Sequence, residues 1–338
     1  MTGVDQPAPL VAIEEHWMLP ELTAALENVG PGRRDESLAL NEHGDTRAHL
    51  EDLGAGRIAR MDAQGIEVAV IALTPPGTQA LAPAEAVALS RTANDVAAAA
   101  VREHPTRLRS WSTLPMSAPE QAAAELERAA ALGHVGTMVY GRAGDLVLDD
   151  PFYDDVFAAA EALGQPVFLH PQLPARALRD AAYRGFDPTT ELALATFGWG
   201  WHLDAATAAL RLILRGTFDR HPNLQLVLGH WGEMLLFWLD RADSLARVAG
   251  LPRSVSDYVR TNVVVTMSGM LNPALLHHAL SVTSTDRLVF STDHPFQHPT
   301  AEEITAFLAE LPSDADREKV SWRNAAAMFG LDPHPTPT

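Results

Sequence analysis

Eight short apolar segments recur along the chain, and their alternation with helical segments constrains the fold more than any other feature. They are rich in Val, Ile and Leu and mostly lack polar alternation, which is typical of strands buried on both faces of a parallel sheet. The expected strands are Val11–His16, Val68–Thr74, Leu108–Leu114, Val135–Gly141, Pro166–His170, Leu224–His230, Val263–Ser268 and Arg287–Asp293. The expected helices include Pro83–Glu103, Ala118–Leu132, Phe152–Leu163, Ala206–Arg220, Ala301–Leu311 and Asp314–Phe329. This count predicts an α/β fold, a (β/α)8 TIM barrel.

A doubly wound open sheet is the alternative architecture. It usually has fewer strands, and the glycine-rich dinucleotide fingerprint that would favour it is missing after the first strand. We expect one barrel domain over residues 1–331 and a flexible, proline-containing tail over residues 332–338.

Two connections, after the first and fifth strands, are longer than a barrel needs. They are Leu19–His49 and Gln172–Asp204, and the second carries Phe197, Trp199, Trp201 and His202. Long loops in compact domains tend to be lids or binding loops, so these aromatic residues are candidates for lining a substrate pocket. The alternative is that the two connections only pack the barrel mouth or a subunit interface.

Charge and composition exclude several classes of partner. The net charge is −18, from 43 acidic against 25 basic residues, which argues against binding to nucleic acid or to anionic membranes. The chain has no cysteine, so a metal must be held by His, Asp and Glu, a set that suits Zn²⁺ or Mn²⁺. No apolar stretch has membrane-spanning length and Met1–Leu10 shows no signal peptide, so we expect a cytoplasmic protein.

Carboxylate and imidazole side chains stand where four of the expected strands end. Glu14 and His16 are two apart on the first strand and so share a face, while His170, His230 and Asp293 end the fifth, sixth and eighth strands. Active sites of such barrels form at the carboxyl ends of the strands. Each residue alone has a simpler interpretation, such as a core histidine or a helix cap. Together they predict one divalent metal site.

The motifs around these residues resemble those of a known family, the amidohydrolase superfamily. Within it, the chain is most similar to the metal-dependent, non-oxidative decarboxylases of the γ-resorcylate and 2,3-dihydroxybenzoate type, and more distantly to aminocarboxymuconate-semialdehyde decarboxylase. The resemblance runs from about residue 10 to the Asn324-Ala325-Ala326 segment. It rests on the order and spacing of these motifs: Val11-Ala12-Ile13-Glu14-Glu15-His16, Phe168-Leu169-His170-Pro171, Gly229-His230-Trp231-Gly232-Glu233, Asp240-Arg241 and Phe290-Ser291-Thr292-Asp293-His294-Pro295-Phe296.

The resemblance implies a role for each matching residue. The metal ligands would be Glu14, His16, His170 and Asp293, with His230 beside the ion and Glu233 behind His230 as an acid–base partner or orienting group. Arg241 matches an arginine that meets the substrate carboxylate, in some members across a subunit boundary; its simpler interpretation is a surface salt bridge. The resemblance also suggests a homodimer or homotetramer.

The implied reaction is decarboxylation of a small hydroxylated aromatic acid, with Asp293 protonating the ring carbon as general acid. One alternative is a metal-dependent hydrolase of a lactone or amide, in which Asp293 deprotonates a metal-bound water and His230 polarises the carbonyl. Another is a metal-binding scaffold without turnover. Tyr140, Gln172 and His294 depart from the decarboxylase pattern at expected pocket positions, so Tyr140 and His294 are candidate substrate contacts; for His294, packing beside the ligand is the other interpretation.

Overall fold

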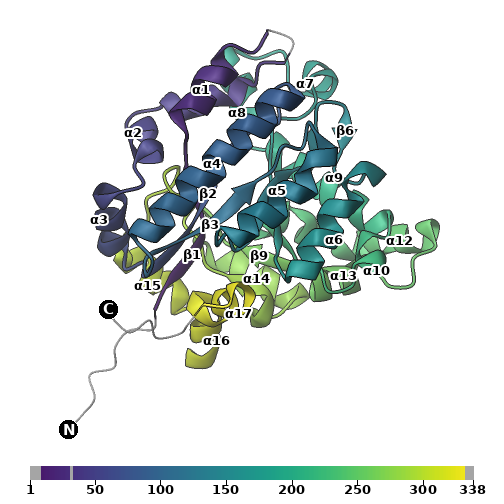
Figure 1. Cartoon of the computed structure of the whole chain (residues 1–338). Coiled ribbons are helices and arrows are strands. Elements are labelled where there is room, and N and C mark those ends of the chain that lie inside the picture. The colour runs from purple at the N-terminus through teal and green to yellow at the C-terminus, as the bar shows by residue number, and fades with distance from the viewer. Residues whose placement is uncertain (1–8, 31–32, 332–338) are drawn as a thin grey trace.

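Eight parallel strands form one sheet that curls into a nearly closed barrel, as the sequence predicts. The computed structural model describes residues 9–30 and 33–331, so the tail expected at 332–338 lies outside the described residues. The strand order is β1-β2-β3-β4-β7-β8-β9-β10 (Figure 1). The bounds are β1 (Val11–Trp17), β2 (Val68–Leu73), β3 (Leu108–Thr113), β4 (Gly136–Tyr140), β7 (Val167–His170), β8 (Leu226–Leu228), β9 (Val263–Thr266) and β10 (Leu288–Val289).

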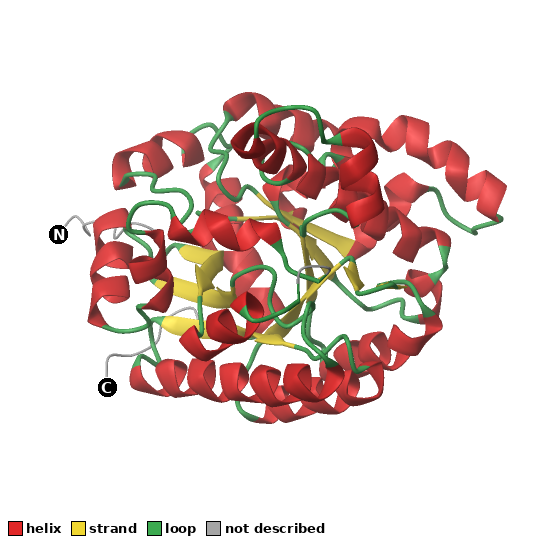
Figure 2. Cartoon of the chain, turned by 90° about the horizontal axis from the view of Figure 1, so that it is seen from above, coloured by secondary structure: helices red, strands yellow, loops and turns green. Residues whose placement is uncertain are grey.

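Helices surround the strands, as Figure 2 shows from above. The longer ones are α3 (Ala55–Gln64), α4 (Pro83–Glu103), α5 (Pro119–Ala131), α6 (Asp154–Leu163), α9 (Gly200–Leu214), α12 (Leu239–Ala249), α13 (Val255–Asn262), α14 (Pro273–Val282) and α15 (Ala301–Leu308). Two expected helices differ most from the structure. The helix expected over Ala206–Arg220 is α9, which begins at Gly200 and ends at Leu214, followed by the separate α10 (Thr217–Arg220). The helix expected over Asp314–Phe329 is divided into α16 (Asp314–Glu318), the π-helical turn η5 (Lys319–Arg323) and α17 (Asn324–Phe329).

The two long connections contain helices of their own. The first holds α1 (Pro20–Glu27), η1 (Glu36–Glu42) and α2 (Thr46–Glu51), and the second holds α7 (Arg176–Ala182), α8 (Pro188–Ala195) and the start of α9. α1, α7 and α8 lie at the top of Figure 1, while α16 and α17 lie at the opposite end. The first end is the one at which the strands finish, so the long connections surround the barrel mouth.

A β-bulge in β1 decides which side chains enter the barrel. The pairing with β2 runs Ala12↔Ala69 and then Glu15↔Ile71, so two residues of β1 face one residue of β2. Val11 and Ile13 belong to the apolar cluster inside the barrel, whereas Ala12 and Trp17 pack in the outer layer. Strict alternation would have sent Glu14 outward with Ala12. The bulge reverses the phase, so that Glu14 and His16 face inward.

The last strand, β10, closes the barrel against β1 with few regular backbone hydrogen bonds. β10 has two residues, fewer than the expected strand, and beyond it the contact with β1 is a single parallel bridge between Glu15 and His294. His16 N–H donates to the His294 carbonyl at 2.6 Å, and Glu14 N–H donates to the Ser291 hydroxyl at 2.6 Å. The Glu15 carboxylate adds bonds from Ser291 Oγ (3.0 Å), Thr292 N (3.0 Å) and Thr292 Oγ1 (2.7 Å). Side chains thus complete the closure that backbone pairing begins.

Packing at the barrel floor centres on Trp111. Its ring meets Phe168 and Phe329 edge-on, with centroids 5.5 and 5.2 Å away, and its Nε1–H donates to the Ile13 carbonyl at 2.6 Å. Phe329 comes from α17, so the C-terminal helix covers this end of the barrel. No helix within residues 9–30 and 33–331 has both the length and the apolar character needed to cross a membrane.

Replacing Trp111 by Ala should destabilise the barrel by roughly 3–5 kcal/mol, because truncating a large buried aromatic side chain leaves a cavity. Denaturation in urea with tryptophan-independent detection, such as circular dichroism, measures this loss. Leu132→Ala is the matched control, since Leu132 is 37% exposed and its truncation should change stability by only a few tenths of a kcal/mol. Equal effects from the two variants would contradict the assigned role of Trp111.

Candidate metal centre

Four side chains meet at the barrel mouth, from the ends of β1 and β7 and from the segment after β10. Glu14 Oε1 lies 3.4 Å from His170 Nε2 and 4.0 Å from His16 Nε2. His16 Nε2 lies 3.3 Å from Asp293 Oδ1. Glu14, His16 and His170 form a group whose ligand atoms are all within 4.8 Å of one another. The structure therefore brings together all four residues expected as metal ligands.

Several donor atoms in this cluster have no hydrogen-bond partner. Glu14 Oε1 and both ring nitrogens of His16 are buried without one among the described residues. His170 Nδ1 faces the Pro171 carbonyl at 2.7 Å, so Nδ1 carries the hydrogen and Nε2 presents a lone pair toward Glu14. A carboxylate and two imidazoles that point unpaired atoms at one spot fit the donor set of Zn²⁺ or Mn²⁺.

Burial shifts the proton affinities of this cluster. It raises the pKa of Glu14 to about 8 and lowers the pKa of His170 to about 3, because a charged group loses its hydration in the barrel interior. The other oxygen of Glu14 accepts from the Thr266 hydroxyl at 3.2 Å and from Ser268. A cation at this spot would favour the carboxylate form of Glu14, so metal binding and loss of its proton are linked.

The segment after β8 presents His230 and Glu233 from an unusual turn. His230, Trp231, Gly232, Glu233 and Met234 have φ values of 46°, 59°, 77°, 54° and 67°, so five consecutive residues are left-handed. For L-residues this handedness costs about 1–2 kcal/mol per residue, and such strain collects at functional sites. The turn also explains why β8 stops at Leu228, before the expected strand end at His230.

His230 connects Asp293 to Glu233. His230 Nε2 lies 3.8 Å from Asp293 Oδ2, and its Nδ1 lies 2.8 Å from Glu233 Oε1. Burial alone would lower the pKa of His230, but the carboxylates of Glu233 and Glu14 raise it well above its usual value. Burial alone would raise the pKa of Glu233, but the charge of His230 and hydrogen bonds from His202 and His230 lower it to about 2. The pair therefore holds a proton on the imidazole and a charge on the carboxylate.

The sequence predicted no catalytic or metal-binding role for two residues at this site. His202 Nδ1 lies 2.7 Å from the second oxygen of Glu233, and the sequence named His202 only as part of a long connection. Glu15 is 3% exposed and binds Ser291 and Thr292, as described above, although its motif drew attention to Glu14 and His16. The doubled Glu14-Glu15 was the available signal for Glu15, whereas no local pattern indicates His202.

The three expected substrate contacts lie in different places. The Tyr140 ring is buried and meets His170 edge-on at 5.8 Å between centroids, with its hydroxyl 3.5 Å from the Leu73 carbonyl oxygen. Burial raises the pKa of Tyr140 well above its usual value. The His294 ring instead stacks on His49, with centroids 5.9 Å apart. Tyr140 thus borders the metal cluster, and His294 packs beside it.

Arg241 is not brought to the cluster. It is exposed on α12, and within the described residues its guanidinium takes part in no hydrogen bond or ion pair. The surface salt bridge that was the simpler interpretation is therefore not seen there either.

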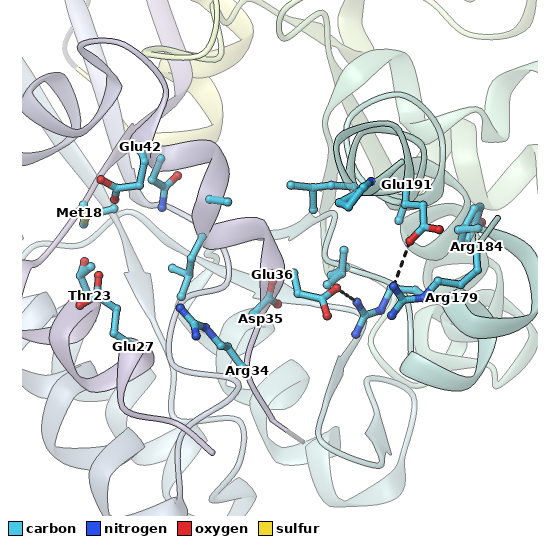
Figure 3. A pocket seen from close by; sticks show the side chains of 18 residues that line it. Met18, Thr23, Glu27, Arg34, Asp35, Glu36, Glu42, Arg179, Arg184 and Glu191 are labelled. Carbon is cyan, nitrogen blue, oxygen red and sulfur yellow. Dashed lines mark hydrogen bonds and ion pairs between the residues drawn. The ribbon is translucent and has the colours of Figure 1, made fainter. Parts of the chain in front are cut away.

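A cavity of about 630 Å³ lies between the two long connections. Figure 3 shows Glu36 of the first connection facing Arg179 of the second, and these two form an ion pair. The aromatic residues of the second connection separate: Trp201 is buried, 6.3 Å from the His170 ring, whereas Phe197 and Trp199 are 58% and 44% exposed. The connections enclose space at the mouth, and only Trp201 of these aromatics reaches the cluster.

Known proteins resemble this chain over nearly its full length. Residues 41–331 match the family described as Amidohydrolase. The γ-resorcylate decarboxylase of Rhodococcus jostii (strain RHA1) is 34% identical over 95% of this chain and 98% of its own length. Decarboxylase orsB of Emericella nidulans is 31% identical over 95% of this chain and 97% of its own length.

Solved structures give the same result. The 5-carboxyvanillate decarboxylase of Sphingomonas paucimobilis superimposes with a TM-score of 0.86 and 31% identity, covering 96% of this chain and 100% of that one. A second structure is the dihydroxybenzoic acid decarboxylase of Polaromonas sp. JS666, solved with bound manganese and the inhibitor 2-nitroresorcinol. It superimposes with a TM-score of 0.82 and 32% identity, covering 96% of this chain and 97% of that one. With its barrel, its strand-end cluster and a family match over residues 41–331, the chain belongs to the amidohydrolase family.

Proposed function

We propose that the protein is a metal-dependent, non-oxidative decarboxylase of a hydroxylated aromatic carboxylic acid. The observation that carries this proposal is the convergence of Glu14, His16, His170 and Asp293, with unpaired donor atoms, in a chain 34% identical to γ-resorcylate decarboxylases. The manganese bound in the similar structures supports Mn²⁺ or Zn²⁺ as the ion. When bound, the ion supplies a Lewis acid that orients the acid and offsets its negative charge.

The four converging residues are the proposed metal ligands. Glu14, His16 and His170 supply one carboxylate and two imidazoles, and Asp293 reaches them through its 3.3 Å approach to His16. Asp293 has φ 65°, a left-handed backbone conformation, and its carboxylate lies between His16 and His230. This position lets one oxygen face the ligands while the other faces His230, 3.8 Å away.

Asp293 and His230 are the proposed catalytic acid pair, with Glu233 as the group that orients His230. Decarboxylation consumes one proton: a C–H bond forms at the ring carbon, the C–C bond breaks, and its electrons return to the ring as carbon dioxide leaves. Burial alone would raise the pKa of Asp293, but the neighbouring imidazoles of His16 and His230 hold it below its usual range. The proton therefore rests on His230 and passes through Asp293 to the ring carbon.

Substrate contacts are proposed for Tyr140 and Arg241. Tyr140 borders His170, so an aromatic acid held at the cluster would lie against its ring. Arg241 is exposed within one chain, so its contact with the substrate carboxylate requires a second copy of the chain, in a homodimer or homotetramer. The exposed Phe237 (51%) and Trp238 (70%) beside it support burial of this surface. For His294, the stacking on His49 favours the packing interpretation.

The remaining expectations complete the proposal. We propose that the chain up to residue 331 acts as one domain in the cytoplasm, on a small molecule and without a nucleic acid partner. The net charge of −18 supports the last point.

A panel of ortho-hydroxybenzoates, lactones and amides, incubated with the metal-loaded protein, tests the reaction class. Release of carbon dioxide from a hydroxybenzoate is the expected result. Hydrolysis of a lactone or amide without decarboxylation would favour the hydrolase alternative, which uses the same residues. If the metal-loaded protein turns over none of the compounds, the result would favour a non-catalytic metal-binding scaffold.

Asp293→Asn should lower kcat by at least ~10²-fold, because the amide cannot deliver the proton that general acid catalysis requires. Steady-state assays of carbon dioxide release measure the effect. Asp314→Asn is the control, since the Asp314 side chain is 87% exposed on α16. Full turnover by Asp293→Asn would rule out the proposed acid.

His16→Ala and His170→Ala should each leave the purified protein with less than one ion per chain, because each removes one of the proposed ligands. Mass spectrometry of metal content measures the stoichiometry, and His277→Ala, an exposed position on α14, should bind like the wild type. Removal of the ion by a chelator should abolish turnover, and added Mn²⁺ or Zn²⁺ should restore it. Full metal content in both ligand variants would refute this site.

Metal binding near pH 7 should release a proton from Glu14. Burial raises the pKa of Glu14 to about 8, so the ion-free carboxyl is mostly protonated at pH 7, and the cation binds only the deprotonated form. Affinity should therefore increase as the pH rises toward about 8 and level off above it. Titration calorimetry in buffers of different ionisation enthalpy counts the released protons; a count that does not change between pH 6 and 9 would contradict the shift.

A further inference from the structure

The carboxylate of Glu233 contacts two imidazoles, those of His230 and His202, and the proposed reaction gives a role only to His230. We propose that His202 is a positioning residue, which fixes the carboxylate of Glu233 and, through it, the ring of His230. This inference rests on the proposed function, since it assigns the support of the same acid pair. It adds a residue from the long connection after β7 to a site built otherwise from strand ends.

Contacts of the Glu233 carboxylate carry the proposal. Its Oε1 lies 2.8 Å from His230 Nδ1 and its Oε2 lies 2.7 Å from His202 Nδ1, and the side chain is fully buried. A carboxylate bound through one oxygen can rotate about its terminal bond, whereas two partners on opposite oxygens define its plane. When the plane of the Glu233 carboxylate is fixed, the direction of its hydrogen bond with His230 Nδ1 is fixed as well.

The ring of His202 is itself oriented. Its Nε2 lies 3.0 Å from the Phe197 carbonyl and its Nδ1 lies 2.7 Å from the Glu233 carboxylate. Both partners can only accept, so each ring nitrogen donates one hydrogen bond. Both contacts lie near the first turn of α9, and the side chain of His202 is 15% exposed. Two hydrogen bonds from opposite nitrogens fix the orientation of the ring, as expected of a group that supports another residue.

Glu233 is closely packed on the side of Gly229. A Cβ placed on Gly229 would lie 3.0 Å from Glu233 Oε1 and 2.9 Å from Glu14 Oε2, so glycine is needed where these carboxylates pass. The rings of His202 and His230 are 4.9 Å apart between centroids. His202 therefore contacts Oε2 of Glu233, whereas His230 and Gly229 lie beside Oε1.

α9 links the second connection to both halves of the site. Its neighbouring residues Trp201 and His202 reach different partners: Trp201 borders His170, with centroids 6.3 Å apart, and His202 holds Glu233. His202, His230 and Glu233 also form a group with the spacing of a metal site. The separate oxygens and the 2.7–2.8 Å distances are those of two hydrogen bonds, so we assign a positioning role, and the test below includes a second ion as an outcome.

Two variants of His202 separate positioning from simple packing. His202→Leu removes the donor and should lower kcat by about 10–100-fold, the usual effect of losing such a supporting contact, with KM changed by less than about threefold. His202→Asn keeps an N–H near the position of Nδ1 and should restore most of kcat. Thr207→Ala, at an exposed position of the same helix, should behave like the wild type.

A double variant tests whether His202 acts through Glu233. In a Glu233→Gln background, His202→Leu should cause little further loss of kcat, because the group that it positions is already altered. Additive losses would overturn the proposal. So would wild-type kcat in His202→Leu, a loss confined to KM, or equal losses in His202→Leu and His202→Asn.

Two measurements that need no turnover keep this inference separate from the proposed function. If the wild type decarboxylates none of the hydroxybenzoates, the proposed reaction is wrong. The positioning role of His202 is then tested by proton NMR of histidine-labelled protein. The His230 ring N–H should exchange slowly in the wild type and in Thr207→Ala, and faster in His202→Leu; unchanged exchange would overturn the inference. A second ion per chain, lost specifically in His202→Leu, would overturn it in favour of metal binding.

Discussion

The carboxylate of Glu14 lies fully buried at the barrel mouth, and the surrounding structure depends on the groups that offset the cost of burying it. An isolated buried carboxylate is costly, and hydroxyls from Thr266 and Ser268 satisfy only one of its oxygens. The other oxygen lies 4.0 Å from His16 Nε2 and 3.4 Å from His170 Nε2, and it accepts no hydrogen bond from the described residues. A cation held by Glu14, His16 and His170 would satisfy all three side chains at once, so the proposed ion would stabilise the barrel mouth as well as take part in the proposed reaction.

The adjacent residue, Glu15, uses the same polar chemistry for a structural purpose. Burial raises the pKa of Glu15 to about 7 even though hydrogen bonds from Thr292 and Ser291 favour its charged form. Arg57 is also buried, and it donates to the His16 carbonyl at 2.5 Å. The edge where the barrel closes and the edge where the ion would bind are therefore one place, built by consecutive residues that point in opposite directions.

The barrel and the meeting of its strand-end side chains could be predicted from the sequence, because the periodicity indicates the strands and a ring of strands brings their ends together. Apolar runs without alternation indicate parallel strands, and a ring of such strands brings residues as distant as Glu14 and Asp293 to one mouth. Contacts that depend on where a helix begins could not be predicted. α9 starts at Gly200 instead of Ala206, and only that earlier first turn lets His202 reach Glu233. The left-handed turn at His230–Met234 was equally hidden, since four of its five residues are not glycine.

The bulge in β1 has a consequence for how such sequences are compared. It works as a half-period phase shift, because one extra residue in the strand exchanges inward and outward positions for everything that follows. A homologue that lost the residue at Ala12 or Ile13 would still contain the Glu-x-His letters of the motif. Its two side chains would nevertheless face the surrounding helices, and the barrel mouth would lose half of its ligands. The motif therefore identifies a metal centre only together with the spacing that precedes it.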